Sequence, residues 1–130
     1  MLIGIVYGTF DLYHIGHENI LRRAKGEVDY LIVGITSPDF DKLRGKNNVH
    51  DSLDDRIKSI KNSGYADEIV IESYVGQKID DIKKYNVDMI FFGSDWEGQM
   101  DYLNDYCKVV YFPRTDGVSS TLLRKTLEYE

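Results

Sequence analysis

Short apolar runs recur along the chain, and the segments between them place apolar residues at helical spacing. Five runs predict strands, at residues 2–7, 30–35, 68–71, 89–92 and 109–112. Each run is almost continuously apolar, which is typical of parallel strands covered on both faces. Each is also far shorter than the roughly 20 apolar residues that span a bilayer. We therefore expect a buried parallel sheet and no membrane-spanning segment.

The segments between the strands predict helices. In residues 17–25, for example, Ile20, Leu21 and Ala24 share one side of a helix. Further helices are expected at residues 52–62, 78–85, 99–106 and 119–129. Alternating strands and helices favour right-handed crossovers within one parallel sheet. The predicted fold is therefore α/β: a Rossmann-like single domain over residues 1–130, with a five-stranded parallel sheet flanked by helices.

Net charge indicates which partners can be excluded, and cysteine content indicates the compartment. The formal net charge is −6 and the isoelectric point is near 5.0, whereas a nucleic-acid or anionic-membrane surface would need a basic face. Cys107 is the single cysteine, which excludes an internal disulfide and fits a reducing compartment. No leader-like segment opens the sequence. We expect a cytoplasmic protein with no nucleic-acid and no membrane partner.

The chain's unusual residues follow the expected strands directly. They are Gly8-Thr9-Phe10-Asp11 up to His17, Arg44-Gly45-Lys46, Lys78, Gly93-Ser94-Asp95-Trp96, and residues 114–121. In open parallel sheets, ligands bind beyond the carboxyl ends of the strands. Five such segments meeting at one edge predict a single binding site there, and they would concentrate the few cations of an acidic protein.

His14, Gly16 and His17 stand at the expected start of the first helix. Unpaired N–H groups at a helix start favour anions, and Gly16 lets a ligand approach the backbone closely. Two imidazoles three residues apart can both point toward such an anion. They could instead form a metal pair, but no cluster of Cys, Glu or a third His accompanies them, and His50 lies in a different loop. We favour a phosphate cradle and expect no metal held by the protein.

A second helix start carries a similar pattern. Arg114 and Gly117 precede the last expected helix, and the hydroxyl groups of Ser119, Ser120 and Thr121 stand at its start. An ordinary helix cap would explain one of these hydroxyls, but it would not explain all three together with Arg114. The segment therefore predicts a second anion site.

These segments resemble the signatures of a known family. Residues 8–12 with His14-Ile15-Gly16-His17 are similar to the signature of the HxGH nucleotidyltransferase superfamily. Residues 114–121 resemble the RTxGxSTT motif of its cytidylyltransferase branch. Along nearly its whole length, including residues 93–98, the chain resembles the bacterial glycerol-3-phosphate cytidylyltransferases. The resemblance implies transfer of CMP from CTP to a phosphorylated alcohol, first of all glycerol 3-phosphate, with release of pyrophosphate.

The resemblance also implies a role for each matching residue. His14 and His17 would stabilise the α-phosphate, Lys46 would hold the triphosphate, and Arg114 would bind its β- and γ-phosphates; these four are the expected catalytic residues. The residues expected to bind CTP are Thr9, Phe10, Gly16, Gly93, Asp95, Trp96, Thr115, Gly117, Ser119, Ser120 and Thr121. Those expected at the acceptor are Asp11, Arg44, Arg56 and Lys78. Mg²⁺ would be carried by the substrate phosphates and water.

Two departures from the family pattern leave the acceptor open. Gly64 stands where an arginine is expected, and one extra residue precedes Arg56. Another polyol-, sugar- or amino-alcohol phosphate therefore remains an alternative acceptor. An adenylyltransferase of the same superfamily, similar to FAD synthetase, is a further alternative, because residues 119–124 resemble the ending of those enzymes. A non-catalytic nucleotide-binding module is the third.

The resemblance finally implies a mechanism and a setting. The acceptor phosphate would attack the α-phosphorus of CTP directly and in line, which requires positioning and positive charge but no protein nucleophile. A homodimer is also implied. CDP-glycerol would supply a cell-surface polymer such as teichoic acid or a capsule.

Overall fold

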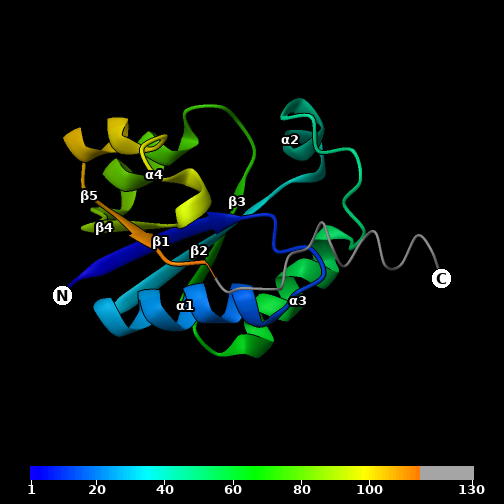
Figure 1. Ribbon diagram of the computed structural model, residues 1–130, viewed down its shortest axis with the longest axis horizontal. Helices are drawn as coiled ribbons and strands as arrows, with labels where there is room; N and C mark the ends of the chain where they lie inside the picture. The colour runs from blue at the N-terminus through cyan, green and yellow to red at the C-terminus, as the bar shows by residue number, and fades with distance from the viewer. Residues whose placement is uncertain (115–130) are drawn as a thin grey trace.

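A central sheet of five parallel strands organises the protein. The computed structural model describes residues 1–114 (Figure 1). The strands are β1 (Ile3–Gly8), β2 (Tyr30–Thr36), β3 (Glu68–Glu72), β4 (Met89–Gly93) and β5 (Lys108–Phe112), in the order β3-β2-β1-β4-β5. The five predicted strands and the α/β, Rossmann-like fold are confirmed. The chain moves outward from β1 in one direction and then in the other, so a crevice forms between the strand ends beside β1.

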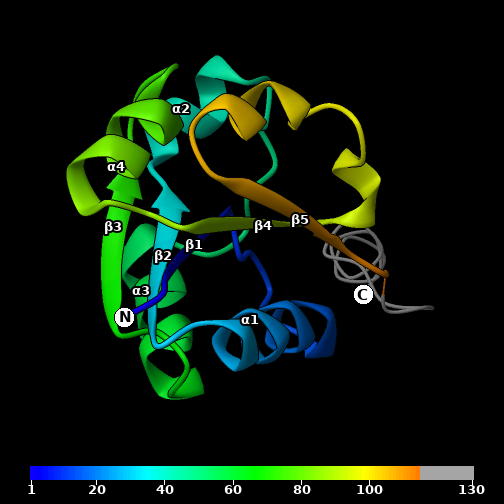
Figure 2. The same ribbon diagram turned by 90° about the vertical axis from the view of Figure 1, so that its left-hand side faces the viewer.

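Helices cover both faces of the sheet. α1 (Ile15–Glu27) and α3 (Leu53–Ser63) lie on one face, and α4 (Gln77–Tyr85) lies on the other (Figure 2). Alternate strand residues supply two cores, as the period of two in a strand requires. Val6 packs in the cluster with α1 and α3, whereas Ile5 packs in the cluster with α4.

Three short elements differ from the sequence expectation. The helix expected at residues 99–106 is only a 3₁₀ helix, η2 (Asp101–Asp105), and a second 3₁₀ turn, η1 (Ser94–Trp96), follows β4. A helix that the spacing did not predict, α2 (Pro38–Leu43), follows β2. Ser37 caps α2 by accepting a hydrogen bond of 3.1 Å from the backbone N–H of Phe40. The helix expected at residues 119–129 lies outside the described residues.

Among residues 1–114, the structure contains no helix with the length and apolar character needed to cross a bilayer.

Candidate active site

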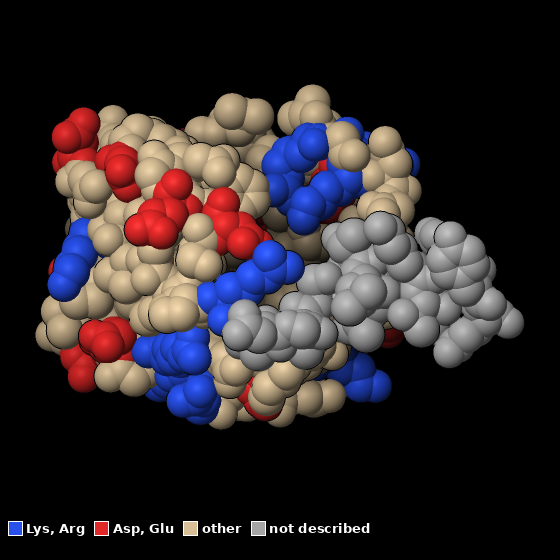
Figure 3. All heavy atoms as spheres, viewed as in Figure 1, with Lys and Arg blue, Asp and Glu red and all other residues tan. Residues whose placement is uncertain are grey.

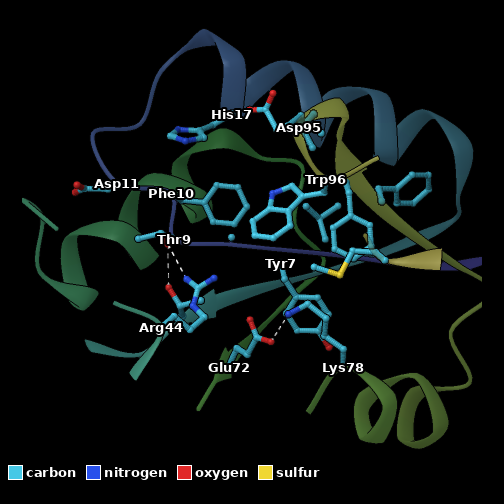
Figure 4. Close-up of a pocket in the computed structure, with 18 of the residues that line it drawn as sticks. Tyr7, Thr9, Phe10, Asp11, His17, Arg44, Glu72, Lys78, Asp95 and Trp96 are labelled. Atoms are coloured by element: carbon cyan, nitrogen blue, oxygen red, sulfur yellow. Dashed lines mark hydrogen bonds and ion pairs between the residues drawn. The ribbon is translucent and has the colours of Figure 1, made fainter. Parts of the chain in front are cut away.

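A pocket of about 290 Å³ opens at the carboxyl ends of the strands, beside β1 (Figure 4). It is lined by the segment after β1, by α1, by the segment after α2, by the start of α4 and by the end of β4. The predicted site residues in its wall are Thr9, Phe10, Asp11, His17, Arg44, Lys46, Lys78, Gly93, Asp95 and Trp96. The pocket therefore brings together residues from four of the five strand ends that the sequence singled out.

The paired histidines form the start of α1. Nδ1 of His14 accepts a hydrogen bond of 3.0 Å from the backbone N–H of Gly16, and Nδ1 of His17 accepts one of 3.2 Å from the backbone N–H of His14. The two rings stack with their centroids 3.9 Å apart. Because each Nδ1 accepts, the neutral imidazoles carry their hydrogen on Nε2. Burial lowers the pKa of His14, which favours this neutral form.

The loop between β1 and α1 is held in an unusual backbone conformation. Phe10 and Leu12 have positive φ angles of 55° and 49°, which cost energy in residues other than glycine. Asp11 fixes the loop, since its carboxylate accepts hydrogen bonds of 2.9 and 2.7 Å from the backbone N–H groups of His50 and Asp51. Asp11 is thus occupied in joining two loops, and its predicted contact with the acceptor stays a prediction.

Two cations meet at the hydroxyl group of Thr9. Its Oγ1 lies 3.3 Å from a guanidinium nitrogen of Arg44 and 3.3 Å from Nζ of Lys46. The buried carboxylate of Asp41 lies 3.3 Å from Arg44 and accepts a hydrogen bond of 2.6 Å from the hydroxyl of Thr36. This network gathers positive charge at one edge of the pocket, and Figure 4 shows Arg44 directed toward Thr9.

Arg56 lies beneath this network and does not line the pocket. It is only 1% exposed, and its Nη1 donates to the backbone carbonyls of Thr9 at 3.1 Å and Thr36 at 2.7 Å. Its Nη2 lies 3.4 Å from Asp41. The side chain therefore joins the ends of β1 and β2 to α2. The guanidinium is used by backbone groups under the pocket, and the expected contact of Arg56 with the acceptor stays a prediction.

Lys78 lies in the pocket wall beside Glu72. Its Nζ lies 2.6 Å from Oε2 of Glu72 and 5.0 Å from the centre of the Tyr7 ring. The Tyr7 hydroxyl donates a hydrogen bond of 2.7 Å to Asp81, and burial together with this carboxylate raises the pKa of Tyr7. Gly34 makes room for the ring, because a Cβ atom there would lie 2.3 Å from Tyr7.

Arg114 does not line the pocket, but it lies beside a residue that does. Its guanidinium lies 3.6 Å from Asp95. Arg23 of α1 donates a hydrogen bond of 3.0 Å to the carbonyl of Pro113, which ties the end of β5 to α1. The other residues of the second predicted anion site come directly after Arg114 in the sequence. They lie outside the described residues: Thr115, Gly117, Ser119, Ser120 and Thr121.

Comparison with known proteins identifies the family. The model of the cytidylyltransferase-like family matches residues 5–126. The chain belongs to this family. It is 42% identical to a glycerol-3-phosphate cytidylyltransferase of Bacillus spizizenii over 95% of each chain. It is 41% identical to one of Staphylococcus aureus, over 95% of this chain and 92% of the relative.

More distant members of the cytidylyltransferase-like family and solved structures are also similar. An ethanolamine-phosphate cytidylyltransferase of Mus musculus is 31% identical over 88% of this chain and 30% of its own length. A lipopolysaccharide core biosynthesis protein of Thermoplasma volcanium superposes with a TM-score of 0.72 at 20% identity, over 89% of this chain and 99% of that chain. At that identity, the structural likeness supports the fold alone.

Several residues of the site were not indicated by any motif in the sequence. Tyr7, Thr36 and Glu72 line the pocket, and Asp41 and Asp81 lie behind it. Most of them are polar residues at strand ends, and that position was the available signal. Their partners come from distant parts of the chain, so their roles become visible only in the folded structure.

Lys and Arg side chains form several groups on a surface of mixed charge, and one of these groups lies over α2 (Figure 3). Acidic patches lie beside it on the same face. Lys42 on α2 and Arg44 and Lys46 just after it belong to this segment. An acidic protein thus presents local positive charge next to the pocket, as a site for phosphates requires.

Proposed function

We propose that this protein transfers CMP from CTP to glycerol 3-phosphate, forming CDP-glycerol and pyrophosphate. One structural observation carries the proposal: the pocket brings His17, in the first turn of α1, together with the cations Arg44, Lys46 and Lys78. The near full-length similarity to glycerol-3-phosphate cytidylyltransferases supports this choice of nucleotide and acceptor.

The reaction requires the displacement of pyrophosphate by an acceptor oxygen. An oxygen of the acceptor phosphate attacks the α-phosphorus of CTP, while the bond to the bridging oxygen of the β-phosphate breaks in line. Negative charge that builds on the α-phosphate is stabilised by the Nε2–H groups of His14 and His17 and by the N-terminus of α1. Lys46 and Arg114 bind the triphosphate and the leaving pyrophosphate. No covalent enzyme intermediate is needed.

We further propose that Mg²⁺ enters the site together with CTP. Among the described residues, no group of three or more His, Cys, Asp or Glu side chains could hold a metal ion. Mg²⁺ usually retains several waters and binds through substrate phosphates. When bound, it would neutralise charge on the triphosphate, while the residues of the protein orient the nucleotide.

We also propose that the enzyme is a cytoplasmic homodimer. The single cysteine and the nucleotide substrate fit the cytoplasm. Exposed apolar side chains at Leu43, Tyr74 and Val75 offer surface that a second copy could cover. Light scattering on the purified protein measures the mass of the particle, and a monomeric mass would reject the dimer.

A substrate panel tests the proposed function. The enzyme is incubated with Mg²⁺, either CTP or ATP, and glycerol 3-phosphate, ribitol 5-phosphate, ethanolamine phosphate or phosphocholine, and the product masses are measured. CDP-glycerol should form fastest. Faster reaction with ethanolamine phosphate would identify that compound as the acceptor in place of glycerol 3-phosphate. It is included because the chain is also similar to ethanolamine-phosphate cytidylyltransferases. Product from ATP alone would indicate an adenylyltransferase, and CTP binding without product would indicate a binding module.

A further inference from the structure

One buried carboxylate in the pocket has no role in the mechanism above. Asp11, Glu72 and Asp95 are the carboxylates that line the pocket among the described residues. The side chain of Asp95 is 67% exposed, and Asp11 is occupied by backbone N–H groups. The side chain of Glu72, in contrast, is 3% exposed and lies in the wall beside Lys78 (Figure 4).

A buried carboxylate at this place is unfavourable for a substrate that carries only negative charge. It repels the phosphate that approaches Lys78, and it offsets part of the charge of that lysine. The ion pair itself is tight, with 2.6 Å between Nζ and Oε2. A neutral side chain would leave Lys78 more attractive to phosphate. The carboxylate is therefore expected to accept a hydrogen bond from a donor group of the substrate.

The other oxygen of Glu72 is placed for such an interaction. Oε2 faces Lys78, and within residues 1–114 no group donates a hydrogen bond to Oε1. Lys78 also uses only one of its three N–H groups within the same residues, so it can bind a phosphate while it remains paired with Glu72. The pair then offers a cation and a hydrogen-bond acceptor side by side.

We propose that Glu72 determines acceptor specificity: its carboxylate accepts a hydrogen bond from a hydroxyl group of the acceptor alcohol while Lys78 binds the phosphate of the same molecule. The pair thus selects phosphorylated polyols over phosphorylated alcohols without a free hydroxyl. This inference rests on the proposed function, because it concerns the acceptor of the same reaction.

The surrounding residues keep the pair in place. Glu72 ends β3, and its backbone carbonyl accepts a hydrogen bond of 2.9 Å from Ser37 after β2. Lys78 lies in the first turn of α4 and over the Tyr7 ring. Gln77 fixes the start of α4 by donating to the carbonyl of Ile71 at 2.7 Å and accepting from the backbone N–H of Ser73 at 2.7 Å. Glu72 and Lys78 are therefore held in place by the end of β3 and the start of α4.

Two matched acceptors separate this role from a purely structural one. Glycerol 3-phosphate and propyl phosphate share a phosphate and a three-carbon chain, but propyl phosphate lacks hydroxyl groups. Displacement of Lys78 would lower kcat/KM for both by a similar factor. Loss of a hydroxyl contact would lower it for glycerol 3-phosphate alone. The ratio of the two values therefore reports on Glu72 itself.

The variants are Glu72→Gln and the matched control Glu68→Gln, at the other end of β3, where Glu68 bonds the hydroxyl of Tyr30. Wild type should prefer glycerol 3-phosphate by at least about tenfold, the value of one hydrogen bond to a charged group. Glu72→Gln should lose most of this preference through a higher KM for glycerol 3-phosphate, with propyl phosphate unchanged or improved. Glu68→Gln should retain it. An equal loss for both acceptors would overturn the proposal.

A wild-type measurement keeps the proposal testable if Glu72→Gln does not fold. Monophosphates of 1,2- and 1,3-propanediol each lack one hydroxyl of glycerol 3-phosphate, and one of them should react as poorly as propyl phosphate. Equal rates for all four acceptors would reject a hydroxyl contact. If no acceptor reacts, the proposed function fails, and calorimetric binding of glycerol 3-phosphate and propyl phosphate in the presence of CTP decides the role of Glu72. Equal affinities would overturn it.

Discussion

His14 has a structural task, and we propose a chemical one for it. Its Nδ1 caps α1, and its Nε2–H is available to stabilise a phosphate oxygen. Asparagine can perform the first task but does not place a donor where the imidazole does. We therefore expect His14→Asn to lower kcat by about 10²–10³-fold, with little change in melting temperature or in CTP affinity. Steady-state kinetics and calorimetry check this, and near wild-type turnover would remove His14 from the mechanism.

The cap also makes the stability of the protein depend on pH. Burial lowers the pKa of His14 from its ordinary value of 6.5, so the unfolded chain binds the proton more readily than the folded one. The stabilisation is complete above about pH 6.5 and is lost as the pH falls toward the folded pKa. As the pH falls below about 6.5, wild type should lose more stability than His14→Asn. Urea unfolding at each pH measures the difference, and parallel curves would contradict it.

Arg56 and Asp41 form a buried ion pair in which each side chain compensates the charge of the other. Removal of the guanidinium in Arg56→Met leaves the carboxylate of Asp41 and two strand-end carbonyls short of a partner. We expect a loss of about 3–5 kcal/mol in the free energy of unfolding. The double variant Asp41→Asn/Arg56→Met should recover part of it. As a control, Arg22→Met on the exposed side of α1 should change stability by less than about 0.5 kcal/mol.

At the scale of secondary-structure elements, the strands could be predicted and two short helical segments could not. Continuous apolar runs such as residues 30–35 have few interpretations other than a buried strand. α2 (Pro38–Leu43) has too few residues to show an apolar repeat, and the signals at its start, Ser37 at the cap and Pro38 at the first helical position, were short ones. Residues 99–106 have helix-like spacing, but the structure forms only one short 3₁₀ helix there. Local spacing is a weak guide where a segment is shorter than about two turns.

Gly64 shows how an element boundary can explain a departure from a family pattern. It ends α3 in the left-handed conformation, with φ at 80°, and no atom lies within 4 Å of the position that a Cβ would take. Gly64→Arg, which introduces the residue expected from the family, should therefore fit sterically but lower stability by about 1 kcal/mol. Gly26→Ala in α1 is the control, since it meets no atom and has no positive φ.

The two glycine variants should shift stability in opposite directions. Alanine is the better helix former, so Gly26→Ala should stabilise by up to about 1 kcal/mol. Urea unfolding of both variants measures the two changes. A stabilising Gly64→Arg would mean that the arginine finds a partner, on this chain or on a second copy, that outweighs the backbone strain.

At the scale of the whole molecule, the position of the site followed from the fold, whereas its chemistry required the folded contacts. Parallel strands bring their carboxyl ends to one edge, so Thr9, Lys46 and Asp95 could be grouped from the sequence. The Glu72–Lys78 pair and the buried position of Arg56 depend on which strands are neighbours and on side-chain burial. The pattern of residues along the chain does not predict those pairings.

Metal dependence tests the site as a unit. If the substrate phosphates carry Mg²⁺, the ion alone should leave the melting temperature unchanged, whereas CTP with Mg²⁺ should raise it. At a ligand concentration about 100 times Kd, the stabilisation is about 2.7 kcal/mol, which is roughly 10 °C for a domain of this size. Removal of Mg²⁺ with EDTA should abolish turnover. Thermal unfolding with Mg²⁺, CTP and both together measures these effects, and ATP with Mg²⁺ is the control for nucleotide choice. A comparable shift with Mg²⁺ alone would show that the protein itself holds a metal, and the charge of that ion would then have to be added to the cations that bind the triphosphate.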